Sequence, residues 1–128
     1  MAIALDHFIV SAPDRKGAAR ELAQLLDVGW DENVFGRFSA VYPSAGLTLD
    51  FMQTQEDFPV AHLCLRVDKA TFDAILGRVV ERGIAYKSAP FGRFDNTVNR
   101  DLGGRGVYWN VPEGHQWEML TASYARPA

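Results

Sequence analysis

The feature that most constrains the fold is a short apolar run with a central histidine, which occurs twice and is followed each time by a helical pattern. The runs are LDHFIV at 5–10 and AHLCLRV at 61–67, and their histidines, His7 and His62, lie 55 residues apart (62 − 7 = 55). Residues within each run alternate in the way that strand side chains do. The repeat therefore predicts two copies of one small unit that begins with a strand and a helix.

Each copy continues into further strands and ends in one that carries a carboxylate. The expected strands after the helices are 30–35, 37–42 and 47–53 in the first copy, and 106–111 and 117–121 in the second. The last strands contain Asp50 and Glu118. We therefore expect an α+β fold of two βαβββ modules, each sheet being covered by a helix on one face only. The expected single domain, 1–128, divides into module 1 at about 4–53, a linker at 54–59 and module 2 at about 60–123.

Alternation along the strands places four chemically active side chains on the faces that no helix covers. They are His7, His62, Asp50 and Glu118. Two imidazoles and a carboxylate form a ligand set that suits Fe(II) and other divalent metals and leaves coordination positions open. Taken alone, either histidine fits a hydrogen-bonded core residue better than a ligand, and Glu118 fits a solvated edge residue. Their matched placement in two repeats favours a metal site made from His7, His62 and Glu118.

Composition and charge exclude several other classes of protein. The chain is 48% hydrophobic and 23% charged with a formal net charge of −3, so nothing predicts a nucleic-acid or membrane-surface partner. Cys64 is the single cysteine, which excludes an intramolecular disulfide. The N-terminus lacks a basic region before its apolar residues, and no apolar run approaches the ~20 residues of a membrane span. We expect a cytoplasmic protein.

Three segments together resemble the vicinal oxygen chelate superfamily, which includes glyoxalase I, fosfomycin-resistance enzymes, extradiol dioxygenases and bleomycin-binding proteins. The segments are DHFIVSAPD, AHLCLRV and GGRGVYWNVPEGHQWEML, and the resemblance covers roughly 4–123. It implies a cup-shaped pair of βαβββ modules around one divalent metal, such as Fe, Mn, Ni, Zn or Co. It also implies that His7, His62 and Glu118 are the ligands, and that a small-molecule substrate chelates the metal through two adjacent oxygens.

The resemblance indicates two candidate catalytic residues and one departure. Tyr108 stands ten residues before Glu118, where fosfomycin enzymes and extradiol dioxygenases are similar in having a tyrosine near the metal; a core aromatic is an equal alternative. Asp50 stands where glyoxalases have a longer Glu, so it is a base, a water-mediated ligand or only a polar neighbour of the cavity. Ile9 and the segment 104–106 differ from the pattern of fosfomycin thiol transferases, which argues against that activity.

Candidate substrate contacts come from charge and aromatic content. Four cations make the 87–105 stretch mildly basic: Lys87, Arg93, Arg100 and Arg105. Arg105 is a candidate contact for an anionic substrate, although a solvated loop is the favoured interpretation. Arg66 shares a strand face with His62, and Trp30 is a candidate wall of an apolar pocket. His115, in the turn PEGHQ, is expected to anchor that turn.

Two classes of function fit these observations. The first is a divalent-metal-dependent enzyme that acts on a small oxygenated molecule, as a glyoxalase-type lyase or isomerase or as an extradiol-type dioxygenase. The alternative is a non-catalytic antibiotic- or metabolite-binding protein of the bleomycin-resistance type. The half-sheets have free edges and an uncovered face, which predicts a homodimer whose sites are shared between subunits.

Overall fold

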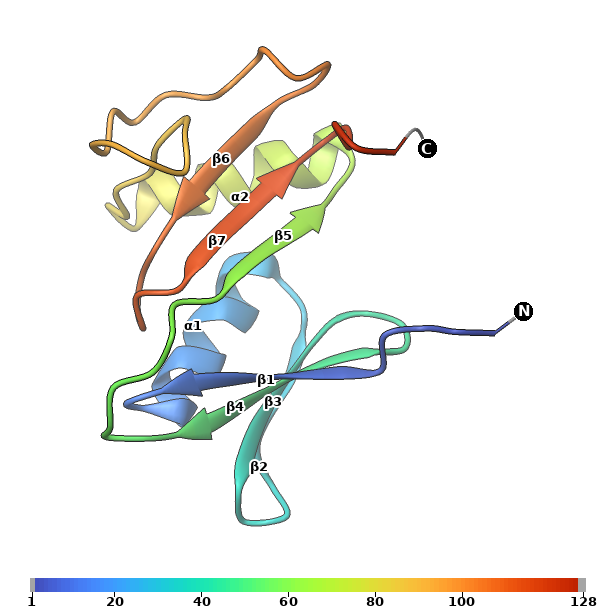
Figure 1. The fold of residues 1–128 in the computed structure, drawn as a ribbon, viewed down its shortest axis with the longest axis vertical. Helices are drawn as coiled ribbons and strands as arrows, with labels where there is room; N and C mark the ends of the chain where they lie inside the picture. The colour runs from blue at the N-terminus through green and yellow to red at the C-terminus, as the bar shows by residue number, and fades with distance from the viewer. Residues whose placement is uncertain (1, 127–128) are drawn as a thin grey trace. The chain divides into compact units, whose positions relative to one another are not determined.

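A computed structural model describes residues 2–126 of the chain, which divides into two compact units, Met1–Pro59 and Val60–Ala128. The division falls at the end of the expected linker, and each unit has its own sheet and one helix (Figure 1). The architecture confirms the expected α+β class with paired modules. Within residues 2–126, no helix is long and apolar enough to cross a membrane.

The first unit is a complete βαβββ module. Its elements are β1 (His7–Ala12), α1 (Arg15–Leu26), β2 (Gly29–Val34), β3 (Phe38–Ser44) and β4 (Leu47–Gln53). The sheet order is β1-β4-β3-β2, with β1 parallel to β4 and the other pairs antiparallel. Asp14 caps α1 by accepting a hydrogen bond from the backbone N–H of Gly17 at 3.1 Å.

The second unit has one regular strand fewer than expected. Its elements are β5 (His62–Arg66), α2 (Lys69–Glu81), β6 (Gly106–Trp109) and β7 (Gln116–Leu120), in the sheet order β5-β7-β6. Where a fourth strand was expected, two isolated bridges join Lys87 to Tyr108 and Asn99 to Gly106. Proline and glycine punctuate this stretch, and such residues interrupt regular strand pairing.

Helix α2 begins and ends as its sequence predicts. Asp68 caps it by accepting from the backbone N–H of Thr71 at 2.7 Å, and Gly83 follows its end with a positive φ of 68°. Its buried residues are Phe72, Ile75 and Val79, whereas the neighbouring Val80 is 58% exposed. Consecutive helix residues are rotated by about 100°, so Val80 lies outside the face that Val79 shares with Phe72 and Ile75.

The core of each unit lies between its helix and its sheet. In the first unit, alternate strand residues such as Val10, Val41 and Phe51 are buried on the face that α1 covers. In the second unit, Trp109 and Trp117 are buried in the same way, and α2 lies behind the sheet in Figure 1. The residues between them in sequence point to the opposite face, which we call the open face of each sheet.

Candidate functional site

The open face of the second sheet brings a histidine, a carboxylate and a phenol together. His62 Nε2 lies 2.8 Å from Glu118 Oε1, and the rings of His62 and Tyr108 meet edge to face with centroids 5.9 Å apart. The Glu118 side chain is only 6% exposed, while that of His62 is 50% exposed. A buried carboxylate thus contacts an imidazole that solvent and ligands can still reach.

Strand register explains why these side chains meet. Cys64 and Tyr108 are the two cross-strand neighbours of Glu118, and Lys87 is bridged to Tyr108 on the other side. Paired residues share a face of a sheet and have Cβ atoms about 5 Å apart. Lys87, Tyr108, Glu118 and Cys64 therefore form one row across the open face, which we call the Glu118 row, and His62 stands diagonally beside it.

Burial and the neighbouring Glu118 carboxylate together raise the pKa of two side chains in this row. Burial, followed by the negative charge of Glu118 and a hydrogen bond to it, raises the pKa of Tyr108 from 10.0 to about 12. The same causes in the same order raise the pKa of the Cys64 thiol to about 12, although the residue as a whole is exposed. Both groups are protonated at neutral pH, so both can donate hydrogen bonds and neither is a ready nucleophile.

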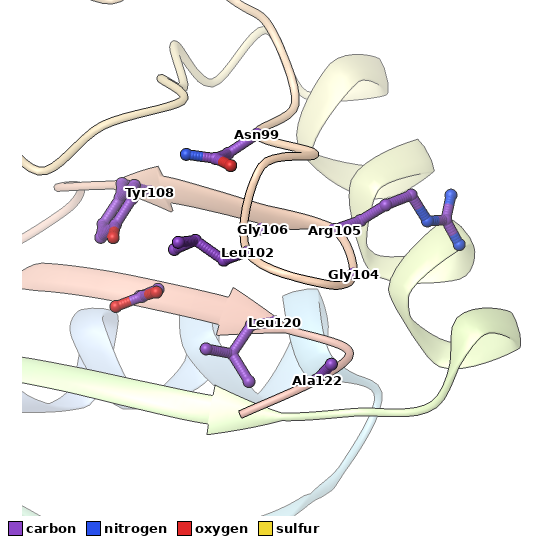
Figure 2. A pocket seen from close by; sticks show the side chains of 9 residues that line it. Asn99, Leu102, Gly104, Arg105, Gly106, Tyr108, Leu120 and Ala122 are labelled. Carbon is purple, nitrogen blue, oxygen red and sulfur yellow. The ribbon is translucent and has the colours of Figure 1, made fainter. Parts of the chain in front are cut away.

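A pocket opens beside Tyr108 and Glu118. It is small, with a cavity volume of about 10 Å³, and its further lining includes Asn99, Leu102 and Leu120 (Figure 2). Most of its accessible wall is apolar, and its polar groups come from Tyr108, Glu118, Asn99 and Arg105. A space of this size holds about one water molecule, beside Tyr108 and Glu118.

The open face of the first sheet carries His7 and Asp50. His7 is paired with Thr48, and Asp50 is paired with Ile9. The side chains of His7 and Asp50 therefore lie diagonally across two neighbouring strands, on the same face of the sheet. The pKa of His7 is raised, first by a hydrogen bond between its Nδ1 and Asp6 Oδ2 at 2.8 Å and also by the charge of Asp50. Asp50 also contributes to a raised pKa of Tyr42, whose hydroxyl donates to Asp31 at 2.5 Å.

The three predicted substrate contacts differ in where the structure places them. Arg66 lies on the open face of the second sheet, in the same strand and on the same side as His62. Trp30 is paired with Val41, which is buried under α1, so Trp30 stands on the opposite face from His7. Its role as a wall of an apolar pocket stays a prediction, and the register places that wall on the side of the sheet that α1 covers.

Arg105 is bound on the helix side of its sheet. Its guanidinium donates to Asp73 Oδ1 at 2.6 Å and lies 4.7 Å from the centroid of the Phe72 ring. Figure 2 shows the side chain extending toward α2 and away from Tyr108. These contacts hold the 99–106 segment to the helix; Arg105 also lines the pocket beside Tyr108, and its contact with an anionic substrate stays a prediction. His115 behaves as expected, since it is 2% exposed and its Nδ1 accepts from the Ala61 N–H at 2.9 Å.

Several residues of this site were missed by sequence reasoning. Asn99, Leu102 and Leu120 line the pocket, and Tyr42 lies within electrostatic range of Asp50. Alternation from Glu118 points to Leu120 on the same face, and that signal was present in the sequence. No comparable signal exists for Asn99 or Leu102, because both lie in an irregular segment.

The donor atoms of His62 and Glu118 fit adjacent positions on a divalent metal. Two ligand atoms that each lie ~2.1 Å from one ion at a right angle are ~3 Å apart, close to the observed 2.8 Å. An imidazole and a carboxylate are also ligand types that Fe, Mn, Ni, Co and Zn accept. Across residues 2–126, no group of three or more His, Cys, Asp and Glu side chains is arranged to hold a metal ion, so here the pair offers two candidate ligand atoms.

Solved structures similar to this chain cover its whole length. Oxidase ChaP-H1 is 38% identical with a TM-score of 0.90, and the alignment covers 98% of this chain and 100% of that one. Oxidase ChaP-H2 is 34% identical with a TM-score of 0.91 and full coverage of both chains. A lactoylglutathione lyase from Agrobacterium tumefaciens shares the fold at 18% identity, with a TM-score of 0.68 and 92% of each chain covered.

Comparison with family models and with curated proteins finds no match. The structural likeness nevertheless confirms what the histidine runs and the GGRGVYWNVPEGHQWEML segment indicate. Two relatives above 30% identity cover the chain, and glyoxalase- and dioxygenase-type structures share its fold. The chain belongs to the vicinal oxygen chelate superfamily.

Proposed function

We propose that the chain is a divalent-metal-dependent oxidative enzyme acting on a small molecule that presents two adjacent oxygen atoms. The observation that carries the proposal is the pair of His62 Nε2 and Glu118 Oε1, 2.8 Å apart, at the edge of a pocket. Between the lyase and dioxygenase chemistries expected from the sequence, the 38% and 34% identities to proteins described as oxidases favour the oxidative one.

The metal in this proposal is held by His62 and Glu118 together with His7. Two histidines and one carboxylate form the ligand set of non-haem Fe(II) oxygenases, so Fe(II) is the first metal to test. When bound, such a metal stabilises negative charge on chelating substrate oxygens and leaves positions open for them. The second module supplies its two ligands from adjacent strands, β5 and β7, which fixes their spacing through backbone register.

Tyr108 serves in this proposal as a hydrogen-bond donor to an oxygen of the substrate. Its pKa of about 12 keeps the phenol protonated at neutral pH, and its ring is held beside His62 by the sheet. Asp50 is placed to hold a proton or to orient His7, whose pKa it helps to raise. Arg66, exposed on the same strand face as His62, is the candidate contact for a polar part of the substrate.

The sites are proposed to be shared in a homodimer in which His7 of one chain meets His62 and Glu118 of the other. Each sheet has an open face, and a two-fold axis produces two equivalent sites from such faces. Light scattering should give about twice the chain mass of 14.2 kDa. Mixing His7→Ala with Glu118→Ala protein should restore metal to a fraction of the sites, whereas a metal-loaded monomer contradicts this arrangement. A cytoplasmic location stays a prediction.

Metal analysis of protein prepared without a His tag tests the central claim. Glu118→Gln removes one charge and one strong ligand, so its metal content should fall at least about tenfold, because ligand loss changes affinity by several kcal/mol. Glu81→Gln is the matched control, since Glu81 is exposed at the end of α2 and makes the same charge change. Equal metal content in both variants is incompatible with Glu118 as a ligand.

Oxygen consumption with a panel of catechols, measured with and without added Fe(II), tests the reaction class. Metal-dependent oxygen uptake supports the oxidative proposal, and turnover of hemithioacetals without oxygen uptake supports the lyase chemistry instead. A non-catalytic ligand-binding protein is the second candidate, because the pocket wall is largely apolar. Tight ligand binding that needs no metal and produces no turnover favours that candidate.

A further inference from the structure

Lys87 is the cation of the 87–105 stretch that the structure buries. It is 8% exposed, while Arg93 and Arg100 are exposed and Arg105 is paired with Asp73. Among the carboxylates of residues 2–126, none forms an ion pair with Lys87. Its ammonium lies 4.9 Å from the centroid of the Phe94 ring.

Backbone pairing fixes Lys87 at the end of the Glu118 row. The N–H of Lys87 donates to the carbonyl of Tyr108, and the N–H of Tyr108 donates to the carbonyl of Lys87, each at 2.9 Å. Residues paired in this way lie directly opposite each other and place their side chains on the same face. Lys87 is thus on the open face, next to Tyr108 and one strand further from Glu118.

A buried ammonium needs compensation for the water that it loses. Burial of a charge is unfavourable unless an opposite charge or several hydrogen bonds replace its hydration. The face of Phe94 replaces part of it, because an aromatic ring attracts a cation, but a neutral ring is a weaker partner than a carboxylate. An anionic oxygen that approached Lys87 along the open face would complete its environment.

We infer that Lys87 binds an anionic oxygen of the substrate, either a carboxylate or a phenolate. Tyr108 lies between this contact and Glu118 in the Glu118 row. The inference rests on the proposed function only for the position of the chelating oxygens near Glu118. It names a substrate class, an acidic oxygenated aromatic or related small acid, and it makes Lys87 a positioning residue that selects for that acid group. A lysine is suited to this role because its ammonium is a compact charge with three donors.

Calorimetric binding of two catechol probes to the full chain tests the inference. Protocatechuate carries a carboxylate at neutral pH, and methylcatechol has the same ring and chelating oxygens without that charge. The wild-type protein should bind protocatechuate about tenfold more tightly, as expected for one charge-assisted hydrogen bond in a partly buried site. Lys87→Met should abolish the preference by weakening protocatechuate alone, and Lys87→Arg should keep most of it.

Lys69→Met is the matched control, because Lys69 is exposed at the start of α2 and makes the same loss of charge in the same unit. It should leave the preference unchanged. Equal binding of both probes by wild-type protein, absence of binding of either, or an unchanged preference in Lys87→Met overturns the inference. The metal content of the same samples reports separately on the proposed function. Absence of metal together with a Lys87-dependent preference for protocatechuate counts against the proposed metalloenzyme, and not against the anion site at Lys87.

Discussion

The high pKa of Tyr108 predicts that the folded protein loses stability in a defined alkaline pH range. The folded-state pKa of about 12 lies above the 10.0 of an exposed phenol, so the folded protein favours the neutral form. Below pH ~10 both states are protonated, and this preference costs nothing. As the pH rises from ~10 to ~12, ionisation of the phenol stabilises the unfolded chain but not the folded chain. The free energy of unfolding therefore falls through this pH range.

The size of the loss follows from the same two values. A rise from 10.0 to about 12 corresponds to about 2.7 kcal/mol at ~1.36 kcal/mol per pKa unit, about half of it lost by pH ~11. Tyr108 is 8% exposed, so solvent screening does not remove the effect. Tyr108→Phe lacks the titrating group and should show no such component.

Urea unfolding of wild-type and Tyr108→Phe protein at pH ~9 and ~11 measures the effect. The quantity to compare is the fall in the free energy of unfolding between the two pH values, in one protein against the other. The wild-type protein should lose about 1.4 kcal/mol more than the variant between the two pH values. Other groups that titrate in this range, including Cys64, cancel because both proteins contain them. An equal loss in the two proteins, or ultraviolet titration of Tyr108 near the ordinary phenol pKa, refutes the reasoning.

Three further changes should affect stability in ways that the same urea experiment can measure. Phe51→Ala removes a fully buried ring from the first unit and should cost about 3–5 kcal/mol, and a cost below about 1 kcal/mol contradicts its place in the core. Asp68→Ala removes the cap of α2 and should cost about 1 kcal/mol, whereas Asp68→Asn should retain most of it. Gly104→Ala places a Cβ 2.5 Å from Thr121 Oγ1 and 3.2 Å from the Ala122 backbone nitrogen, and should cost about 1–3 kcal/mol. Gly77→Ala, where a Cβ meets nothing within 4 Å, should be neutral or stabilising.

The regular half of the fold was predictable because local signals agreed with tertiary packing. The 47–53 strand has the observed bounds, and Asp14 and Asp68 cap helices where polar residues precede apolar stripes. The meeting of His62 with Glu118 also follows from alternation, since both side chains belong to the open face. The grouping of His7 with them remains a prediction.

The parts that sequence reasoning could not determine depend on register and on loops. WDENVF does not alternate clearly between apolar and polar residues, so nothing local decides which face Trp30 occupies, and pairing with Val41 decides it. Arg105 immediately precedes β6, and its partners Asp73 and Phe72 lie more than thirty residues away in the helix. Unlike the meeting of His62 with Glu118, this contact follows from no alternation of strand side chains, because Arg105 lies in an irregular segment.

The irregular 87–105 segment has a consequence for how such a chain can change its ligand. It replaces an edge strand, yet regular pairing holds it at only two points, Lys87 and Asn99. Leu102 lines the pocket from this segment and belongs to no strand, so exchanging it alters no backbone hydrogen bond of β6 with β7. Pocket shape can therefore diversify by small steps in this segment while the sheet that holds His62 and Glu118 keeps its geometry, which makes it the natural target for libraries that seek new substrates.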